Sequence, residues 1–164
     1  MSLPNWITAT AAVIATALLP ACDMLNLPEI KPGITSASEV RSRMGEPGFE
    51  HRDDDGTVTW EYSRQPQGVH CYMISFDRQQ IVSQIEQVLN EKNFTQVRDG
   101  MSREDVRRLL GTPASKIVFN NLQEDIWEWR VEGSLASEET YFMVHFDLSS
   151  GGVKKTSRRV AMKG

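Results

Sequence analysis

The chain has 164 residues, of which 40% are hydrophobic and 24% charged, an ordinary composition for a globular protein. This length suits one domain or two small ones. The formal net charge of −4 argues against nucleic acid as a partner, because binding phosphates requires a surplus of basic groups.

The first 21 residues have the pattern of a targeting segment. No Lys, Arg, Asp or Glu occurs before Asp23, and residues 7–19 form a mainly apolar run. Such a run is shorter than the ~20 residues of a membrane span but suits the core of a signal peptide. The sequence Leu-Pro-Ala-Cys at residues 19–22 resembles a lipobox, in which the cysteine becomes the lipidated first residue of the mature protein. The alternatives are a plain secretory signal and an N-terminal anchor helix.

Cys22 is therefore the expected lipidation site, and residues 22–29 are the expected tether to the folded part. Asp23 is the expected sorting residue, since an aspartate at this place keeps lipoproteins of enteric bacteria in the inner membrane. With Cys22 acylated, Cys71 has no partner for an intramolecular disulfide. We expect Cys71 to be a small apolar residue of a strand.

The remaining chain contains one series of motifs twice, which predicts two similar units. Each series has a glycine, a short helix, a Gly-x-Pro turn, a tryptophan in a strand and a phenylalanine in the next strand. The corresponding residues are Gly33 and Gly100, Ser36 and Ser102, Val40 and Val106, Gly45 and Gly111, Pro47 and Pro113, Trp60 and Trp127, and Phe76 and Phe146. We predict a first unit at residues 30–89 and a second at 90–164.

Each unit is predicted to begin with a helix of about two turns. Ser36 with Glu39, and Ser102 with Asp105, have the spacing of a capping box. A glycine and then a proline end each helix. Helices this short need a sheet on which to pack.

Runs of alternating or apolar residues predict the strands. An additional helix at residues 91–97 is expected to lead into the second unit. The expected strands are residues 57–63, 69–76 and 81–88 in the first unit, and 124–131, 140–147 and 153–160 in the second. The predicted fold class is therefore α+β, with one or two short helices on a three-stranded antiparallel sheet in each unit.

These motifs resemble the outer membrane protein assembly factor BamE family, also called SmpA/OmlA. The shared pattern is a short helix, G-[MI]-[ST], a helix bearing valine, [LM]-G-x-P and W-x-[YW] in a strand, and residues 64–68 look like the family's loop after that strand. A tandem pair of such units is also similar to secreted β-lactamase inhibitor proteins, which bind proteins through the sheet. The resemblance implies a lipoprotein of the bacterial envelope that faces the periplasm and contacts assembly components and anionic lipid. It favours the outer membrane, and Asp23 leaves the inner membrane open.

Strand parity predicts a partner-binding surface. If Trp60 and Tyr62 pack under the helix, Glu61 faces away from it, because side chains alternate along a strand. An open sheet face that carries methionine and tyrosine is more apolar than solvent requires. The alternatives are that the two units pack these faces on each other, or that the register differs by one. With Arg64, which matches the family's loop arginine, the expected partner-binding residues are Glu61, Arg64, Met73, Glu128, Tyr141, Met143 and His145.

We find no nucleophile elbow, phosphate loop or metal-ligand spacing, so no catalytic residue, metal or cofactor is expected. The acidic run at residues 53–55 is interpreted as a solvated turn. The favoured hypothesis is a non-enzymatic, lipid-anchored scaffold that binds envelope proteins in outer-membrane protein assembly or envelope maintenance. The alternatives are a periplasmic or secreted inhibitor-type binder that uses the open sheet faces, and an enzyme whose site no motif reveals.

Overall fold

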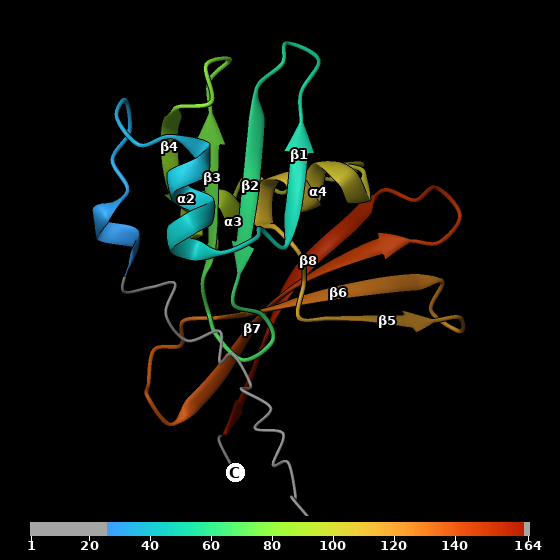
Figure 1. Cartoon of the computed structure of the whole chain (residues 1–164). Helices are drawn as coiled ribbons and strands as arrows, with labels where there is room; N and C mark the ends of the chain where they lie inside the picture. Colours follow the sequence, from blue (N-terminus) through green and yellow to red (C-terminus); the bar gives the residue numbers. More distant parts are fainter. Residues whose placement is uncertain (1–25, 163–164) are drawn as a thin grey trace, which may run out of the picture.

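The computed structural model describes residues 26–162, which form two four-stranded antiparallel sheets with short helices, an α+β fold (Figure 1). Strand order follows the sequence in both sheets, β1-β2-β3-β4 and β5-β6-β7-β8. The elements are η1 (Leu27–Glu29), α2 (Ala37–Met44), β1 (Phe49–Arg52), β2 (Val58–Ser63), β3 (Cys71–Phe76), β4 (Val82–Gln87), α3 (Glu91–Phe94), α4 (Arg103–Leu110), β5 (Ser115–Phe119), β6 (Glu124–Val131), β7 (Glu138–Asp147) and β8 (Val153–Met162). The predicted signal peptide, Cys22 and Asp23 lie outside the described residues.

The two longer helices begin and end as predicted from the sequence. Ser36 starts α2 and Ser102 starts α4, and both form a complete capping box with the acid three residues later. Gly45 and Gly111 end these helices with φ angles of 81° and 76°, which a residue with a side chain rarely adopts. The helix predicted at residues 91–97 is shorter, since α3 ends at Phe94.

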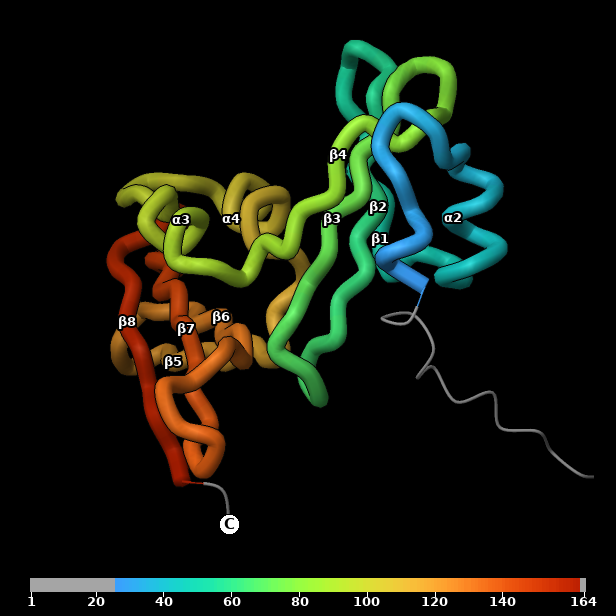
Figure 2. The backbone as a smooth tube through the Cα atoms, turned by 90° about the vertical axis from the view of Figure 1, so that its left-hand side faces the viewer, coloured from blue at the N-terminus to red at the C-terminus, as the bar shows by residue number. Residues whose placement is uncertain are grey.

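The first sheet carries α2 on its outer face (Figure 2). Trp60 and Tyr62 of β2 point towards α2, as strand parity predicts, and Phe76 packs its ring edge against Trp60. The Tyr62 hydroxyl donates to the carbonyl of Gly45 at the end of α2. The buried cluster on this side consists of Ile30, Ala37, Val40, Met44, Val58, Trp60, Tyr62, Ile74, Phe76 and Val82.

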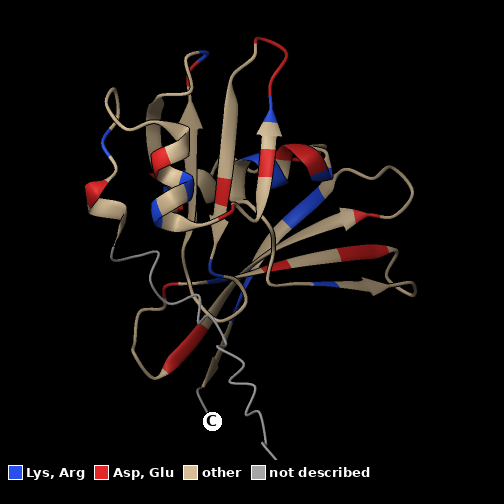
Figure 3. Cartoon of the chain, in the orientation of Figure 1, with Lys and Arg blue, Asp and Glu red and all other residues tan. Residues whose placement is uncertain are grey.

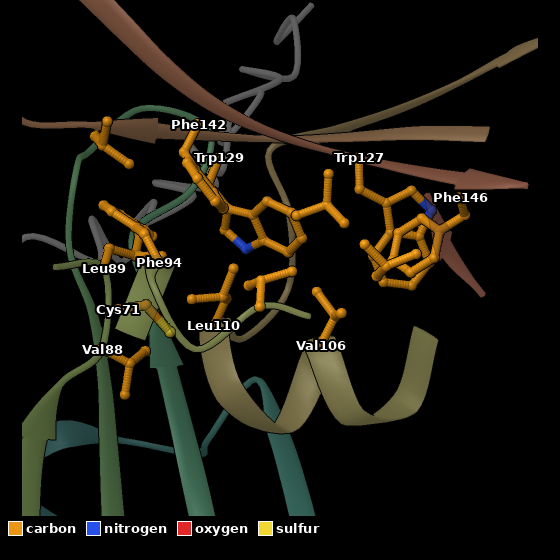
Figure 4. Close-up of a cluster of buried hydrophobic side chains, with 14 of the residues drawn as sticks. Cys71, Val88, Leu89, Phe94, Val106, Leu110, Trp127, Trp129, Phe142 and Phe146 are labelled. Carbon is orange, nitrogen blue, oxygen red and sulfur yellow. The ribbon is translucent and has the colours of Figure 1, made fainter. Parts of the chain in front are cut away.

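A second helix layer, made of α3 and α4, lies between the two sheets (Figure 2). Val106 and Leu110 of α4 pack on Trp127 and Trp129 of β6, and the other side of the same cluster reaches Cys71 of the first sheet (Figure 4). The two sheets therefore share one core through α4. This cluster consists of Cys71, Met73, Val88, Leu89, Phe94, Val97, Val106, Leu110, Trp127, Trp129, Val131, Phe142, Val144, Phe146 and Val153.

The prediction of three strands in each sheet is wrong, because β1 and β5 add a fourth strand to each. Both are edge strands, and each pairs only with the strand that follows it. An edge strand need not alternate between apolar and polar residues, since little of it is buried. The polar sequence of β1 and the mostly exposed side chains of β5 therefore carry no period-2 signal.

Candidate partner-binding surfaces

Glu61 lies inside the molecule, where it joins the two sheets. It was predicted to face a partner, but α4 covers this face of the first sheet, and only 1% of Glu61 is exposed. Its Oε1 accepts the backbone N–H of Thr112 at 2.7 Å, and its Oε2 lies 3.5 Å from Nε2 of His51. Burial alone raises the pKa of Glu61, but His51, Thr112 and Arg107 outweigh this and hold that pKa below its ordinary value. Glu61 is thus a buried carboxylate that secures the turn after α4.

Met73 and Cys71 lie beside Glu61 and are buried by the same helix. Met73 was predicted on an open face and is buried by α4 instead, so the two predicted faces do not pack on each other. Cys71 is free and fully buried, as expected for a small apolar residue. Burial and the neighbouring Glu61 raise the pKa of the Cys71 thiol, which keeps it protonated and unreactive.

Arg64 begins a loop that contacts the second sheet. The next residue, Gln65, follows the end of β2, and its side-chain amide donates to the carbonyl of Arg130 at 2.7 Å and accepts the Arg130 N–H at 3.0 Å. The Arg130 guanidinium in turn donates to the carbonyl of Gln67 at 2.9 Å. Half-buried Arg64 lines an open cleft of about 830 Å³ with residues that include Glu46, and Gln65 and Gln67 at the edge of this cleft reach Arg130, the cross-strand neighbour of Tyr141.

The four remaining predicted residues lie together on one face of the second sheet. Glu128 of β6 is paired with Met143 of β7, and Tyr141 and His145 lie two positions to either side of Met143. This face points away from α4, because Trp127, Trp129 and the alternate residues of β7 fill the core. We call it the open face. No element of residues 26–162 covers it, as the order of layers in Figure 2 shows.

A hydrogen-bonded chain crosses three strands on the open face. Oε2 of Glu124 lies 2.8 Å from Nδ1 of His145, and Nε2 of His145 lies 2.8 Å from Oγ of Ser157. Lys154 and Lys155 approach the other oxygen of Glu124 at 3.1 Å and 3.5 Å. The hydrogen bond with His145, followed by the two lysines, holds the pKa of Glu124 at about 2. These hydrogen bonds hold β6, β7 and β8 in register. They also leave little of His145 exposed for a partner.

The rest of the open face combines apolar groups with ion pairs. Glu128 accepts a hydrogen bond from Ser115 at 3.0 Å and lies 3.4 Å from the Arg159 guanidinium. The same guanidinium covers the ring of Tyr141, 4.1 Å from its centroid. Tyr141 and Met143 are half-buried and stay accessible. β8, at the edge of this sheet, carries several Lys and Arg residues (Figure 3).

Two further features bear on the predicted sites. In the acidic turn between β1 and β2, Asp53 pairs with Arg108 of α4 at 2.6 Å and Asp55 accepts from Thr57, so both carboxylates are occupied within the protein.

Among residues 26–162, no three His, Cys, Asp or Glu side chains are grouped as metal ligands. In the same part of the chain, no helix is long and apolar enough to cross a membrane.

The family comparison concerns the half of the chain that carries the open face. Residues 86–151 match the model of the outer membrane protein assembly factor BamE domain. This region is therefore similar to a BamE domain. The matched residues include α3, α4 and β5 to β7, and therefore the core tryptophans and all four predicted residues of the open face. The BamE resemblance drawn from the sequence motifs is thus confirmed for this region.

Other comparisons found distant similarity. None of the curated proteins matches the chain. A candidate beta-lactamase inhibitor protein from Streptococcus mutans is 12% identical with a TM-score of 0.33, over 83% of this chain and 94% of that one. A DUF4309 family protein from Bacillus subtilis is 14% identical with a TM-score of 0.29, over 82% of each chain.

Proposed function

We propose that this protein is a lipid-anchored scaffold of the bacterial envelope that binds other envelope proteins in outer-membrane protein assembly. In this proposal residues 1–21 are a signal peptide, Cys22 carries the lipid and residues 22–29 are the tether. Residues 30–89 and 90–164 are two tandem BamE-like units. The BamE match at residues 86–151 supports the envelope role and its non-enzymatic character.

The open face is the observation that carries this proposal. The corresponding face of the first sheet is closed by α4, which buries Met73 and Glu61 there. On the second sheet the equivalent Met143 and Glu128 have no covering helix among the described residues, and Tyr141 adds an accessible aromatic ring. Accessible methionine and tyrosine beside paired charges are typical of a protein interface.

The decisive experiment is crosslinking and affinity capture from fractionated envelopes. Met143→Lys places a charge on the open face, where Glu128 can pair with it, so the fold is expected to survive. Ile34→Lys is the matched control, because Ile34 is an exposed apolar residue of the first half, on a turn remote from the open face. Capture of outer-membrane assembly components by wild type and Ile34→Lys, but not by Met143→Lys, is the expected result.

The anchor is tested in the same fractions. Cys22→Ala is expected to release the protein from the membrane, since acyl chains contribute about 0.8 kcal/mol per buried CH₂. Asp23→Ser tests sorting, and an unchanged outer-membrane location would show that Asp23 does not direct it. Recovery of wild type in soluble form with one soluble enzyme would contradict the scaffold and favour an inhibitor-type binder.

A further inference from the structure

The two sheets have four edge strands, and three of them are protected against pairing with another chain. Glu50 and Arg52 give β1 a charged surface, and these two side chains also pair with each other. The first residue of β4 is bonded through its backbone to Gly33 and Thr35, which cover that end of the edge. β8 is strongly basic, with the side chains of Lys154, Lys155, Arg158 and Arg159. Charges and covering segments are the usual means of keeping an edge unpaired.

β5 is the exception. Its sequence is Ser-Lys-Ile-Val-Phe, and Ile117, Val118 and Phe119 are 43%, 54% and 38% exposed. Leu122, in the turn that follows, is also exposed. Three consecutive exposed apolar residues place apolar groups on both faces of the strand, because neighbouring side chains point in opposite directions. β5 pairs only with β6, so one side of its backbone is free of sheet hydrogen bonds.

Lys116 is the one charged residue of β5. The Lys116 ammonium lies 4.0 Å from the centre of the Trp127 ring, on the side of the sheet that faces α4. None of the ion pairs within residues 26–162 includes Lys116. An added strand with a carboxylate opposite Lys116 would form that ion pair, and apolar residues opposite Ile117, Val118 and Phe119 would form cross-strand pairs, each worth roughly 0.2–1 kcal/mol.

We propose that β5 is a docking edge for an extended segment of a partner protein, which adds as an antiparallel strand. The segment has consecutive apolar residues facing Ile117–Phe119 and an acidic residue facing Lys116. Main-chain hydrogen bonds would supply affinity and the side-chain pairs would supply selectivity, as in other strand-addition complexes. This proposal rests on the proposed protein-binding function and specifies one partner surface, separate from Tyr141 and Met143.

Binding of synthetic peptides to the full chain tests this directly. The probe is a capped heptapeptide with a valine-isoleucine-valine core followed by one glutamate. One control peptide has lysine in place of the glutamate, and a second has proline at the central position, which cannot pair. Fluorescence anisotropy measures affinity, and hydrogen exchange shows whether the peptide protects the amides of residues 115–119.

Substitutions at two valines that are similarly exposed make the test specific. Val118→Lys charges the β5 edge, whereas Val160→Lys charges β8, the other edge of the same sheet, where Val160 is 56% exposed. Val118→Lys is expected to weaken glutamate-peptide binding by up to about fivefold, since it removes the apolar pair at Val118, which is worth roughly 0.2–1 kcal/mol. Val160→Lys is expected to bind as wild type does. Lys116→Glu is expected to reverse the preference, so that the lysine peptide binds better than the glutamate peptide.

Three results would overturn the proposal. The first is equal peptide affinity in wild type and Val118→Lys, and the second is protection of amides outside β5. The third is concentration-dependent dimerisation that Val118→Lys abolishes, because a second copy would then occupy the edge. Envelope capture separates this proposal from the proposed function. Suppose that Val118→Lys captures the same assembly components as wild type and that the peptides do not bind. The proposal that β5 is a docking edge is then wrong, whereas the proposed scaffold function is still supported.

Discussion

At the scale of single residues, the same motif has different roles in the two halves. Glu61 and Glu128 follow the equivalent tryptophans Trp60 and Trp127, and both point away from the helix that packs on their own sheet. Glu61 is buried under the turn after α4 and accepts a backbone N–H there. Glu128 remains on the open face and is balanced by Arg159. Glu128 is also buried, at 8% exposed, so the surroundings of the motif decide whether this carboxylate joins two halves or is paired within one sheet.

Alanine substitutions at Gly111 and Gly45 test how closely the turn after α4 packs on the first sheet. A Cβ at Gly111 would lie 2.5 Å from Sγ of Cys71, whereas a Cβ at Gly45 would have no neighbour within 4 Å, and both φ angles are positive. Gly45→Ala is expected to lower the free energy of unfolding by about 1–3 kcal/mol, the cost of placing a side chain at φ 81° and ψ −166°, a conformation that essentially only glycine adopts. Gly111→Ala adds an overpacking cost of about 1–3 kcal/mol.

Urea denaturation of the two glycine variants checks this prediction. Combining Gly111→Ala with Cys71→Ala removes the Sγ atom, and the double variant is expected to be more stable than the sum of its single effects. Equal losses in Gly45→Ala and Gly111→Ala would contradict the close packing of Gly111 on Cys71.

The hydrogen bond between Glu124 and His145 predicts how the stability of the protein depends on pH. The pKa of Glu124 is about 2 in the folded protein, against 4.5 for an ordinary glutamate. Between these values the unfolded chain binds a proton at Glu124 that the folded protein does not. This stabilising contribution is therefore complete above about pH 4.5 and disappears as pH falls through 2. The stability difference between wild type and Glu124→Gln is expected to shrink over this range in urea titrations at pH 6, 4 and 2.5, and a constant difference would contradict the assignment.

At the scale of elements, the sequence predicts what local chemistry determines. Ser36 and Ser102 mark the helix starts through capping boxes, and alternation in β2 and β6 places Trp60 and Trp127 in the core. The edge strands β1 and β5 were missed because exposure removes that alternation. The burial of Met73 was missed because α4, which covers it, lies about 30 residues further along the chain. No local pattern indicates which distant helix covers a sheet face.

Because α4 lies between the two sheets, its apolar side chains are expected to matter more than those of an ordinary surface helix. Leu110 is fully buried in the cluster that includes both Cys71 and Trp129, whereas its neighbour Leu109 is only partly buried. Leu110→Ala is expected to cost about 2–5 kcal/mol, through lost burial and the cavity left behind. Leu109→Ala is the matched control and should cost clearly less in guanidinium denaturation. Equal losses would mean that α4 does not fill a shared core.

At the scale of the whole molecule, the contacts between the halves form a continuous set. Glu61 bonds the backbone of Thr112, Gln65 bonds the backbone of Arg130, and Asp53 pairs with Arg108. Together with the packing of α4 on β3, these contacts tie the first sheet to the second. The two halves are therefore expected to unfold as one cooperative unit, although each has its own sheet.

Native-state hydrogen exchange tests this cooperativity, because it reports opening of each strand separately. The slowest amides of β3 and β7 are expected to share one opening free energy, since neither sheet can lose α4 without exposing apolar core. Gln65→Ala removes both hydrogen bonds to Arg130 and is expected to lower the two values together, by about 1–3 kcal/mol. A first sheet that opens alone, with β7 still protected, would contradict the shared core and make the second sheet with its helices an independent unit. A common opening would mean instead that the sheet carrying the open face and the β5 edge unfolds together with the first sheet.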